Sequence, residues 1–228
     1  MHMHSSEQAA ALHFPVQAEV PETRTHLRLR TLLFDFLWLA FAGVAKIGSE
    51  QFVYWDPTDI GACLAPDAFV RFGDPDHEFD SWKVWEHGAP HVAIEIISNS
   101  DRRGWDKKLD AYRRMGVSEL VAFNPEFPEQ PLRIWDFVGD GLLERKLLEP
   151  YAKSLHLGGF WRSFEIAGEG PSLRLSHDEQ GQSLFLTPKE SEARRAEAET
   201  RRADAEAQRA DLAERKLREL EALLGRES

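Results

Sequence analysis

The segment HVAIEIISNSDRRGWDKKLDAY, His91 to Tyr112, joins an apolar run directly to a charged one. The apolar run has the branched composition of a buried strand, and the charged run predicts a helix from about Arg102 to Met115 that ends at Gly116. Glu95 is the single acid within the apolar run. Because an ionised carboxylate is costly to bury alone, we expect a cation or a set of hydrogen-bond donors to meet Glu95.

The elements around this segment predict an α/β or α+β fold and not a helical bundle. An apolar helix is expected through THLRLRTLLFDFLWLAF (25–41), capped by Thr23 or Thr25. Strands are expected at QFVYW (51–55), DAFVRF (67–72), HVAIEIIS (91–98) and SELVAF (118–123), and a hairpin is expected at 132–150, turning at Asp140-Gly141. The predicted order is helix, three strands, helix, strand and hairpin.

The two ends of the chain differ in composition from this middle part, 23–186. Residues 1–22 show no periodicity, and we expect them to form a flexible entry. The segment 187–228 is expected to be a charged helix, because from Pro188 it carries ten basic and eleven acidic residues with no glycine before Gly225. A weak heptad, with leucines only near its end, leaves two alternatives: a coiled coil, or a single exposed helix held by i,i+4 ion pairs.

Composition limits the class of protein. The chain has 228 residues, 42% of them hydrophobic, and a net charge of −11, so binding of nucleic acid through an overall basic surface is disfavoured while a local basic groove stays open. Cys63 is the single cysteine, which predicts no intramolecular disulfide and a cytoplasmic location. The longest apolar run is interrupted by Asp35 and is too short to span a bilayer, so we expect no membrane segment.

A second acid and a lysine suggest chemistry for Glu95. Asp67 follows Pro66 at the head of the strand that precedes Glu95 in sequence. Two carboxylates on adjacent strands offer the hard oxygen ligands that Mg²⁺ prefers, with Mn²⁺ as an alternative. Lys108 lies four residues before Tyr112, on one helix face, where it could orient a water molecule or neutralise a phosphate. The combination predicts metal-dependent phosphodiester hydrolysis.

Each of these residues also has a simpler interpretation. Asp67 alone is typical of a turn, Glu95 alone could pair with a structural arginine, and Lys108 beside Lys107 could belong to a solvated helix face. Trp82, Trp85 and Trp105 flank the motif and could either stack on bases or serve as core and rim residues. Arg102 and Arg103, near the start of the predicted helix, are the candidates for contacts with a phosphate backbone.

The motifs resemble a known family. The stretches APDAFVRFG and WKVWEHGAPHVAIEIISNSDRRGWDKKLDAYRRMGVSELVAFNP look like the Uma-two family of the PD-(D/E)xK nuclease superfamily, and the resemblance covers roughly residues 26–186. It implies a restriction-endonuclease-like αβββαβ core, to which the hairpin and a C-terminal charged helix are added. It also implies that Asp67 and Glu95 ligate Mg²⁺, that the carbonyl of Ile96 completes the site, and that Lys108 replaces the motif lysine, since Ile97 stands at that position. Two further positions differ from the family pattern, which has tyrosine where this chain has Leu120 and aspartate where it has Asn124.

The sequence therefore predicts a Mg²⁺-dependent DNA endonuclease in which Asp67, Glu95 and Lys108 are catalytic. Its expected partner is DNA, and a homodimer could form through the nuclease domain or the helical tail. Two alternatives stay open: a non-catalytic module of the same fold that binds a partner through the C-terminal helix, and a factor that is active only with a partner.

Overall fold

The computed structural model describes residues 14–15, 22–73, 76–98, 104–166 and 168–224, with side chains described up to residue 218. The chain divides after Phe185 into two compact units, which are described separately below.

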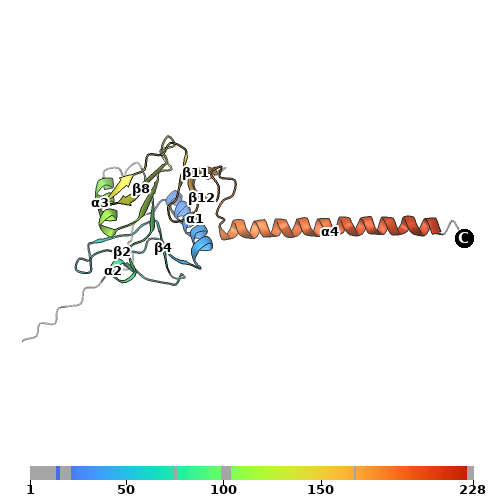
Figure 1. The fold of residues 1–228 in the computed structure, drawn as a ribbon, viewed down its shortest axis with the longest axis horizontal. Coiled ribbons are helices and arrows are strands. Elements are labelled where there is room, and N and C mark those ends of the chain that lie inside the picture. The colour runs from blue at the N-terminus through green and yellow to red at the C-terminus, as the bar shows by residue number, and fades with distance from the viewer. Residues whose placement is uncertain (1–13, 16–21, 74–75, 99–103, 167, 225–228) are drawn as a thin grey trace, which may run out of the picture. The chain divides into compact units, whose positions relative to one another are not determined.

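A six-stranded sheet forms the centre of the first unit (Figure 1). Its strands lie in the order β1 (Ala45–Gly48), β4 (Ala68–Phe72), β6 (Val92–Ile96), β7 (Glu119–Phe123), β8 (Leu132–Val138) and β9 (Gly141–Glu144). Within this sheet β6 and β7 pair in parallel, the other described pairs are antiparallel, and α3 (Trp105–Met115) lies between β6 and β7 in the chain. With α1 (Arg24–Phe41) before β1, the larger elements follow the chain order α, β, β, β, α, β, which confirms the predicted core and its added hairpin.

The two main helices pack on opposite faces of this sheet. Successive side chains on a strand point to opposite faces. Ile94 and Ile96 of β6 belong to the hydrophobic cluster that contains the buried leucines and Phe36 of α1, whereas Ala93 and Ile97 belong to the cluster that contains Trp105 and Tyr112 of α3. Glu95 has the same parity as Ala93 and Ile97, and it therefore lies on the face covered by α3.

Smaller elements surround the sheet. A three-stranded sheet combines β2 (Val53–Tyr54), β3 (Cys63–Leu64) and β5 (Trp82–Lys83), and the short helix α2 (Val84–His87) follows β5. A second three-stranded sheet contains β10 (Tyr151–Lys153), β11 (Phe160–Ile166) and β12 (Gly170–Ser176). Buried Trp161 of β11 and Leu175 of β12 join the same hydrophobic cluster as α1, so this sheet completes the core on the α1 face.

The strand predicted at QFVYW is shorter than expected and belongs to a different sheet. QFVYW contributes only Val53 and Tyr54 to the small sheet, while the first strand of the central sheet is the preceding segment Ala45–Gly48, which pairs with β4. Gly48 lies inside this strand opposite Phe69. A Cβ atom at residue 48 would overlap the Phe69 ring, so the close approach of the two strands requires glycine.

Two local boundaries also differ from the prediction. The two-residue turn between β8 and β9 is Gly139-Asp140, one position earlier than expected, because Val138 pairs with Gly141. Gly139 has a φ of 65°, as a hairpin turn with glycine at its first central position requires. Helix α3 begins at Trp105 and ends at Gly116, whose φ of 81° gives the expected left-handed cap. The predicted earlier start at Arg102 lies outside the described residues.

The second unit contains one long helix, α4 (Pro188–Leu224), which confirms the predicted charged C-terminal helix. Thr187 and Glu190 cap its start reciprocally: the Glu190 N–H donates to Thr187 Oγ1 at 3.2 Å and the Thr187 N–H donates to Glu190 Oε2 at 2.8 Å. An i,i+4 ion pair joins Arg201 to Glu197 at 3.2 Å. Leu212 and Leu217 are exposed, and the choice between a single helix and a coiled coil stays a prediction.

The packing of Gly48 gives a first test. Gly48→Ala should lower the free energy of unfolding by about 1–3 kcal/mol, because the added methyl group displaces the Phe69 ring or separates β1 from β4. Gly43→Ala is the matched control, since nothing lies within 4 Å of a Cβ atom there and its φ is not positive. Urea unfolding of both variants measures the difference. Equal stability of the two would contradict the placement of Ala45–Gly48 in the central sheet.

Candidate active site

The pairing of β4 with β6 places Asp67 opposite Glu95. The two strands are antiparallel and align Ala68 with Ile94 and Phe69 with Ala93. Continuing this register by one residue past the end of β4 brings Asp67 opposite Glu95. Opposite residues on antiparallel strands point to the same face with their Cβ atoms about 5 Å apart. The sheet alone therefore brings both predicted acids together on the face covered by α3.

Helix α3 supplies a partner for each oxygen of the Glu95 carboxylate. Glu95 is 2% exposed; its Oε2 accepts a hydrogen bond from Lys108 Nζ at 2.6 Å, and its Oε1 accepts one from the Tyr112 hydroxyl. Lys108 and Tyr112 are four residues apart and so lie on one face of α3. Burial raises the pKa of Glu95 to about 7; the positive charge of Lys108 opposes this rise and the negative charge of Asp67 adds to it.

The Asp67 carboxylate is held by the sheet and by α1. The backbone N–H of Ile96 donates to Asp67 Oδ2 at 2.6 Å. His26, in the first turn of α1, places its Nε2 at 2.5 Å from Asp67 Oδ1. The hydrogen bond to Asp67 raises the pKa of His26, against the opposing effect of its partial burial. The ion pair formed by a protonated His26 neutralises one of the two acids.

Three residues of this cluster were predicted from the sequence, and two were missed. Asp67, Glu95 and Lys108 do lie in one cluster. Tyr112 was noted only for its helical spacing from Lys108, although that spacing is what directs both side chains to Glu95. His26 carried no signal beyond its place after the Thr23 cap. Ile96 was predicted to offer its carbonyl to a metal, and the contact recorded for it here is through its N–H.

The remaining predicted residues have separate positions. Arg102 and Arg103, the candidates for contacts with the phosphate backbone, lie outside the described residues. Trp82 is buried and its indole N–H donates to the Gly88 carbonyl at 2.8 Å, so it is a core residue. Trp85 is 38% exposed. Trp105 is buried and lines a pocket on the α3 face of the sheet.

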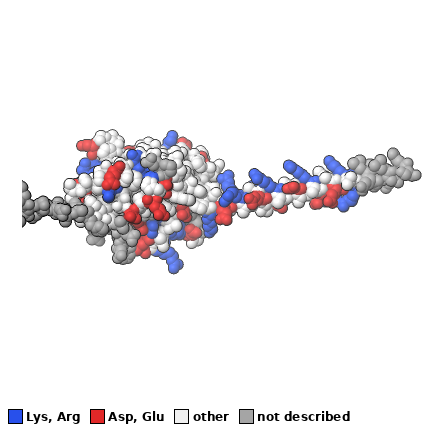
Figure 2. Space-filling model, turned by 90° about the horizontal axis from the view of Figure 1, so that it is seen from below, with Lys and Arg blue, Asp and Glu red and all other residues white. Residues whose placement is uncertain are grey.

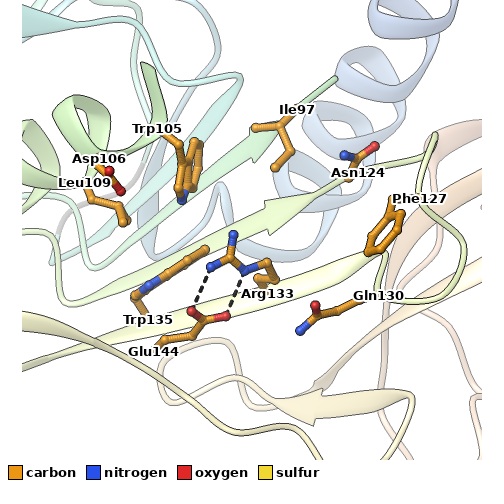
Figure 3. Close-up of a pocket in the computed structure, with 10 residues that line it drawn as sticks. All are labelled: Ile97, Trp105, Asp106, Leu109, Asn124, Phe127, Gln130, Arg133, Trp135 and Glu144. Carbon is orange, nitrogen blue, oxygen red and sulfur yellow. Dashed lines mark hydrogen bonds and ion pairs between the residues drawn. The ribbon is translucent and has the colours of Figure 1, made fainter. Parts of the chain in front are cut away.

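A pocket of about 460 Å³ (Figure 3) lies on the face of the sheet that α3 covers, the same face as the acid pair Asp67 and Glu95. Ile97, two residues after Glu95 on the same side of the chain, lines it together with Trp105 and Leu109 of α3. The remaining lining residues are Asp106, Asn124, Phe127, Gln130, Arg133, Trp135 and Glu144. Pocket and acid pair thus share one wall, the helix α3.

The chemistry of the acid pair fits a Mg²⁺ ion. Among the described residues, no group of three or more His, Cys, Asp or Glu side chains lies close enough to hold a metal. Mg²⁺ keeps several water ligands in proteins and often needs only one or two carboxylates. Each oxygen of the Asp67 and Glu95 carboxylates makes one described contact. A carboxylate oxygen has two lone pairs, so each of these oxygens can also accept a metal ion. The type and number of the ligand oxygens therefore suit Mg²⁺.

Charge is distributed without one dominant sign on the face that Figure 2 shows. Acidic and basic side chains alternate there over the first unit and along α4. Within the part of the chain that the structure describes, no helix is long and apolar enough to cross a membrane.

The fold defines the class, a mixed α/β protein with an N-terminal helix, several sheets and a long C-terminal helix. The model of the Uma2 family, described as "Putative restriction endonuclease", matches residues 15–173. The chain belongs to this family.

The chain is also similar to a solved structure described as a "putative nuclease belonging to DUF820" from Anabaena variabilis ATCC 29413, with 15% identity, a TM-score of 0.37, and coverage of 54% of this chain and 72% of that chain. No curated protein matches the sequence.

The raised pKa of Glu95 predicts a pH-dependent stability. In the unfolded chain the carboxyl titrates near 4.5 and in the folded protein near 7, so folding favours its protonated form. The contribution of Glu95 protonation to the free energy of unfolding is complete below pH 4.5. It decreases by about 3 kcal/mol as the pH rises to 7. Glu95→Gln removes the titration. We expect the unfolding free energy of the variant, minus that of the wild type, to increase between pH 5 and 8 in EDTA; a constant difference would contradict the raised pKa.

Proposed function

We propose that this protein is a Mg²⁺-dependent endonuclease that hydrolyses phosphodiester bonds of DNA. The observation that carries the proposal is the cluster itself: Asp67 and Glu95 face each other on neighbouring strands, and Lys108 lies 2.6 Å from Glu95. Its membership of a family described as "Putative restriction endonuclease" supports the same chemistry. Mn²⁺ should replace Mg²⁺, because both ions prefer oxygen ligands.

In this proposal each residue has a defined role. Asp67, Glu95 and the carbonyl of Ile96 would hold the ion. The ion would lower the pKa of a bound water molecule and would place positive charge near the scissile phosphate. Lys108 orients the attacking water or neutralises charge that develops on the phosphate. Tyr112 fixes the rotamer of Glu95 through its hydroxyl, so that the carboxylate stays aimed at the site.

The negative net charge limits how DNA would bind. With −11 on the chain, attraction has to be local, and we propose that Arg102 and Arg103, just before α3, contact the phosphate backbone. A cytoplasmic location and a homodimer through the first unit or α4 accompany the proposal, since many nucleases that cut both strands act as dimers.

A second function is supported by a specific feature of the site. The charges of both acids are already matched by side chains, Glu95 by Lys108 and Asp67 by His26. A protein that had kept the fold without the activity could retain this arrangement as two buried ion pairs. It would then act as a non-catalytic module that binds a partner through the exposed helix α4.

Substitution of the proposed catalytic residues separates the two functions. Asp67→Asn, Glu95→Gln and Lys108→Ala should each lower cleavage of supercoiled DNA at least about 100-fold, because each removes a metal ligand or the cation beside it. Lys107→Ala is the matched control, since Lys107 is the exposed neighbour of Lys108 on the same helix and should retain activity. Cleavage is followed on gels with Mg²⁺ and Mn²⁺. Wild-type activity in Glu95→Gln would exclude this site.

Metal binding has a signature that is independent of cleavage. Mg²⁺ at 100 times its dissociation constant should stabilise the wild type by about 2.7 kcal/mol, and Glu95→Ala should lose this effect. The stabilisation should be larger at pH 8 than at pH 6, because ionisation of Glu95, with a pKa of about 7, precedes binding. Thermal unfolding with and without Mg²⁺ measures it. The non-catalytic alternative predicts no stabilisation at either pH.

A further inference from the structure

The pocket beside the acid pair has an aromatic wall with one unsatisfied donor. Trp105 and Trp135 lie with ring centroids 5.5 Å apart, and the guanidinium of Arg133 stacks over Trp135 at 4.6 Å. The indole N–H of Trp105 is buried and has no hydrogen-bond partner among the described residues. In Figure 3 the nitrogen lies at the end of the ring directed toward Trp135 and Arg133. A buried donor without a partner is costly to maintain, which points to an acceptor from a ligand.

The charges of the pocket favour a neutral ligand over an anion. Arg133 is the basic residue among the pocket's lining residues, and it is bound at 2.8 Å and 2.7 Å by the two carboxylate oxygens of Glu144 (Figure 3). Asp106, also in the lining, adds a negative charge. A phosphate would therefore gain little from Arg133 and would be repelled by Asp106 and Glu144. A flat, uncharged ring with hydrogen-bonding edges suits the faces of the two tryptophans, whose rings are tilted by 50°, and the exposed amide of Gln130.

The position of the pocket connects this ligand to the acid pair. Ile97 and Glu95 are two residues apart on one side of an extended chain, which corresponds to about 7 Å. Residues of β7 and β8 extend the same face: Asn124 follows β7, and Arg133 and Trp135 lie on β8. A nucleotide adjoining a phosphate held at Glu95 could place its base in the pocket without leaving this face.

We propose that the pocket binds one unstacked nucleobase of the substrate strand, next to the scissile phosphodiester. This inference rests on the proposed nuclease function and specifies its substrate: a strand whose bases are accessible, either single-stranded or with a base turned out of a duplex. The base stacks against the tryptophans, and one of its acceptor atoms receives the Trp105 N–H. Contacts of this kind accept bases through their π-face and their edges, as in other proteins that bind unpaired bases.

Binding measured without cleavage tests the pocket separately from the chemistry. The full chain carrying Glu95→Gln is titrated in EDTA with a fluorescent single-stranded DNA 12-mer and with an abasic strand of equal length and charge. We expect the base-carrying strand to bind at least 10-fold more tightly. Adding Trp105→Phe, which keeps an aromatic ring but removes the indole N–H, should reduce this ratio about 5-fold. Trp38→Phe, at an exposed tryptophan of α1 outside the pocket, should leave it unchanged.

A second variant guards against a folding defect at Trp105. Gln130→Ala alters an exposed residue at the pocket and should also reduce the ratio, with an unchanged thermal midpoint. Equal binding of both strands, or an unchanged ratio in both pocket variants, would overturn the pocket proposal even if the wild type cleaves DNA. If the preference for the base-carrying strand depends on Trp105 but the wild type cleaves nothing with Mg²⁺ or Mn²⁺, the base-binding pocket is supported and the nuclease function is overturned. No binding of either strand would overturn the pocket proposal, and it would overturn both proposals if the wild type also cleaves nothing with Mg²⁺ or Mn²⁺.

Discussion

Glu95 is a carboxylate buried in the middle of a β-sheet, and much of the arrangement around it compensates for that burial. Its two oxygens are met by Lys108 and Tyr112, so the acid fixes which face of α3 turns toward the sheet. Asp67, opposite, is tied to the N–H of Ile96 and to His26, which connects the start of α1 to the same point. The acid pair thus joins both main helices at one end of β4 and β6.

Stability alone gives little reason for such an arrangement. Buried ion pairs often contribute no more than well-packed apolar residues of the same size, because desolvation offsets their attraction. Burial leaves Glu95 with a pKa of about 7, so near neutral pH a fraction of the molecules carries it protonated. Strongly shifted pKa values of this kind occur preferentially at functional sites, where a charged ligand provides the missing compensation. A Mg²⁺ ion beside Asp67 and Glu95 would be such a ligand.

The residues show why the sequence revealed part of the site and not the rest. Glu95 was recognisable because an acid in an apolar strand violates the expected pattern, and Lys108 because its spacing from Tyr112 fixes a helix face. His26 was missed because its contact with Asp67 joins residues 41 positions apart, and no local pattern encodes that contact. The strand Ala45–Gly48 was missed for a related reason: Gly48 is required by the Phe69 ring on the next strand, which is a tertiary constraint that resembles a local helix-ending signal.

Joint binding of a divalent cation by Asp67 and Glu95 is tested most directly by a crystal structure of the protein soaked in Mn²⁺ with anomalous diffraction data. If the two acids bind the ion, an anomalous peak lies between the two carboxylates, with at least one oxygen of each at bonding distance from the ion. Absence of a peak, with His26 still on Asp67 and Lys108 still on Glu95 in a crystal saturated with Mn²⁺, would contradict metal binding and assign the cluster to structural ion pairing.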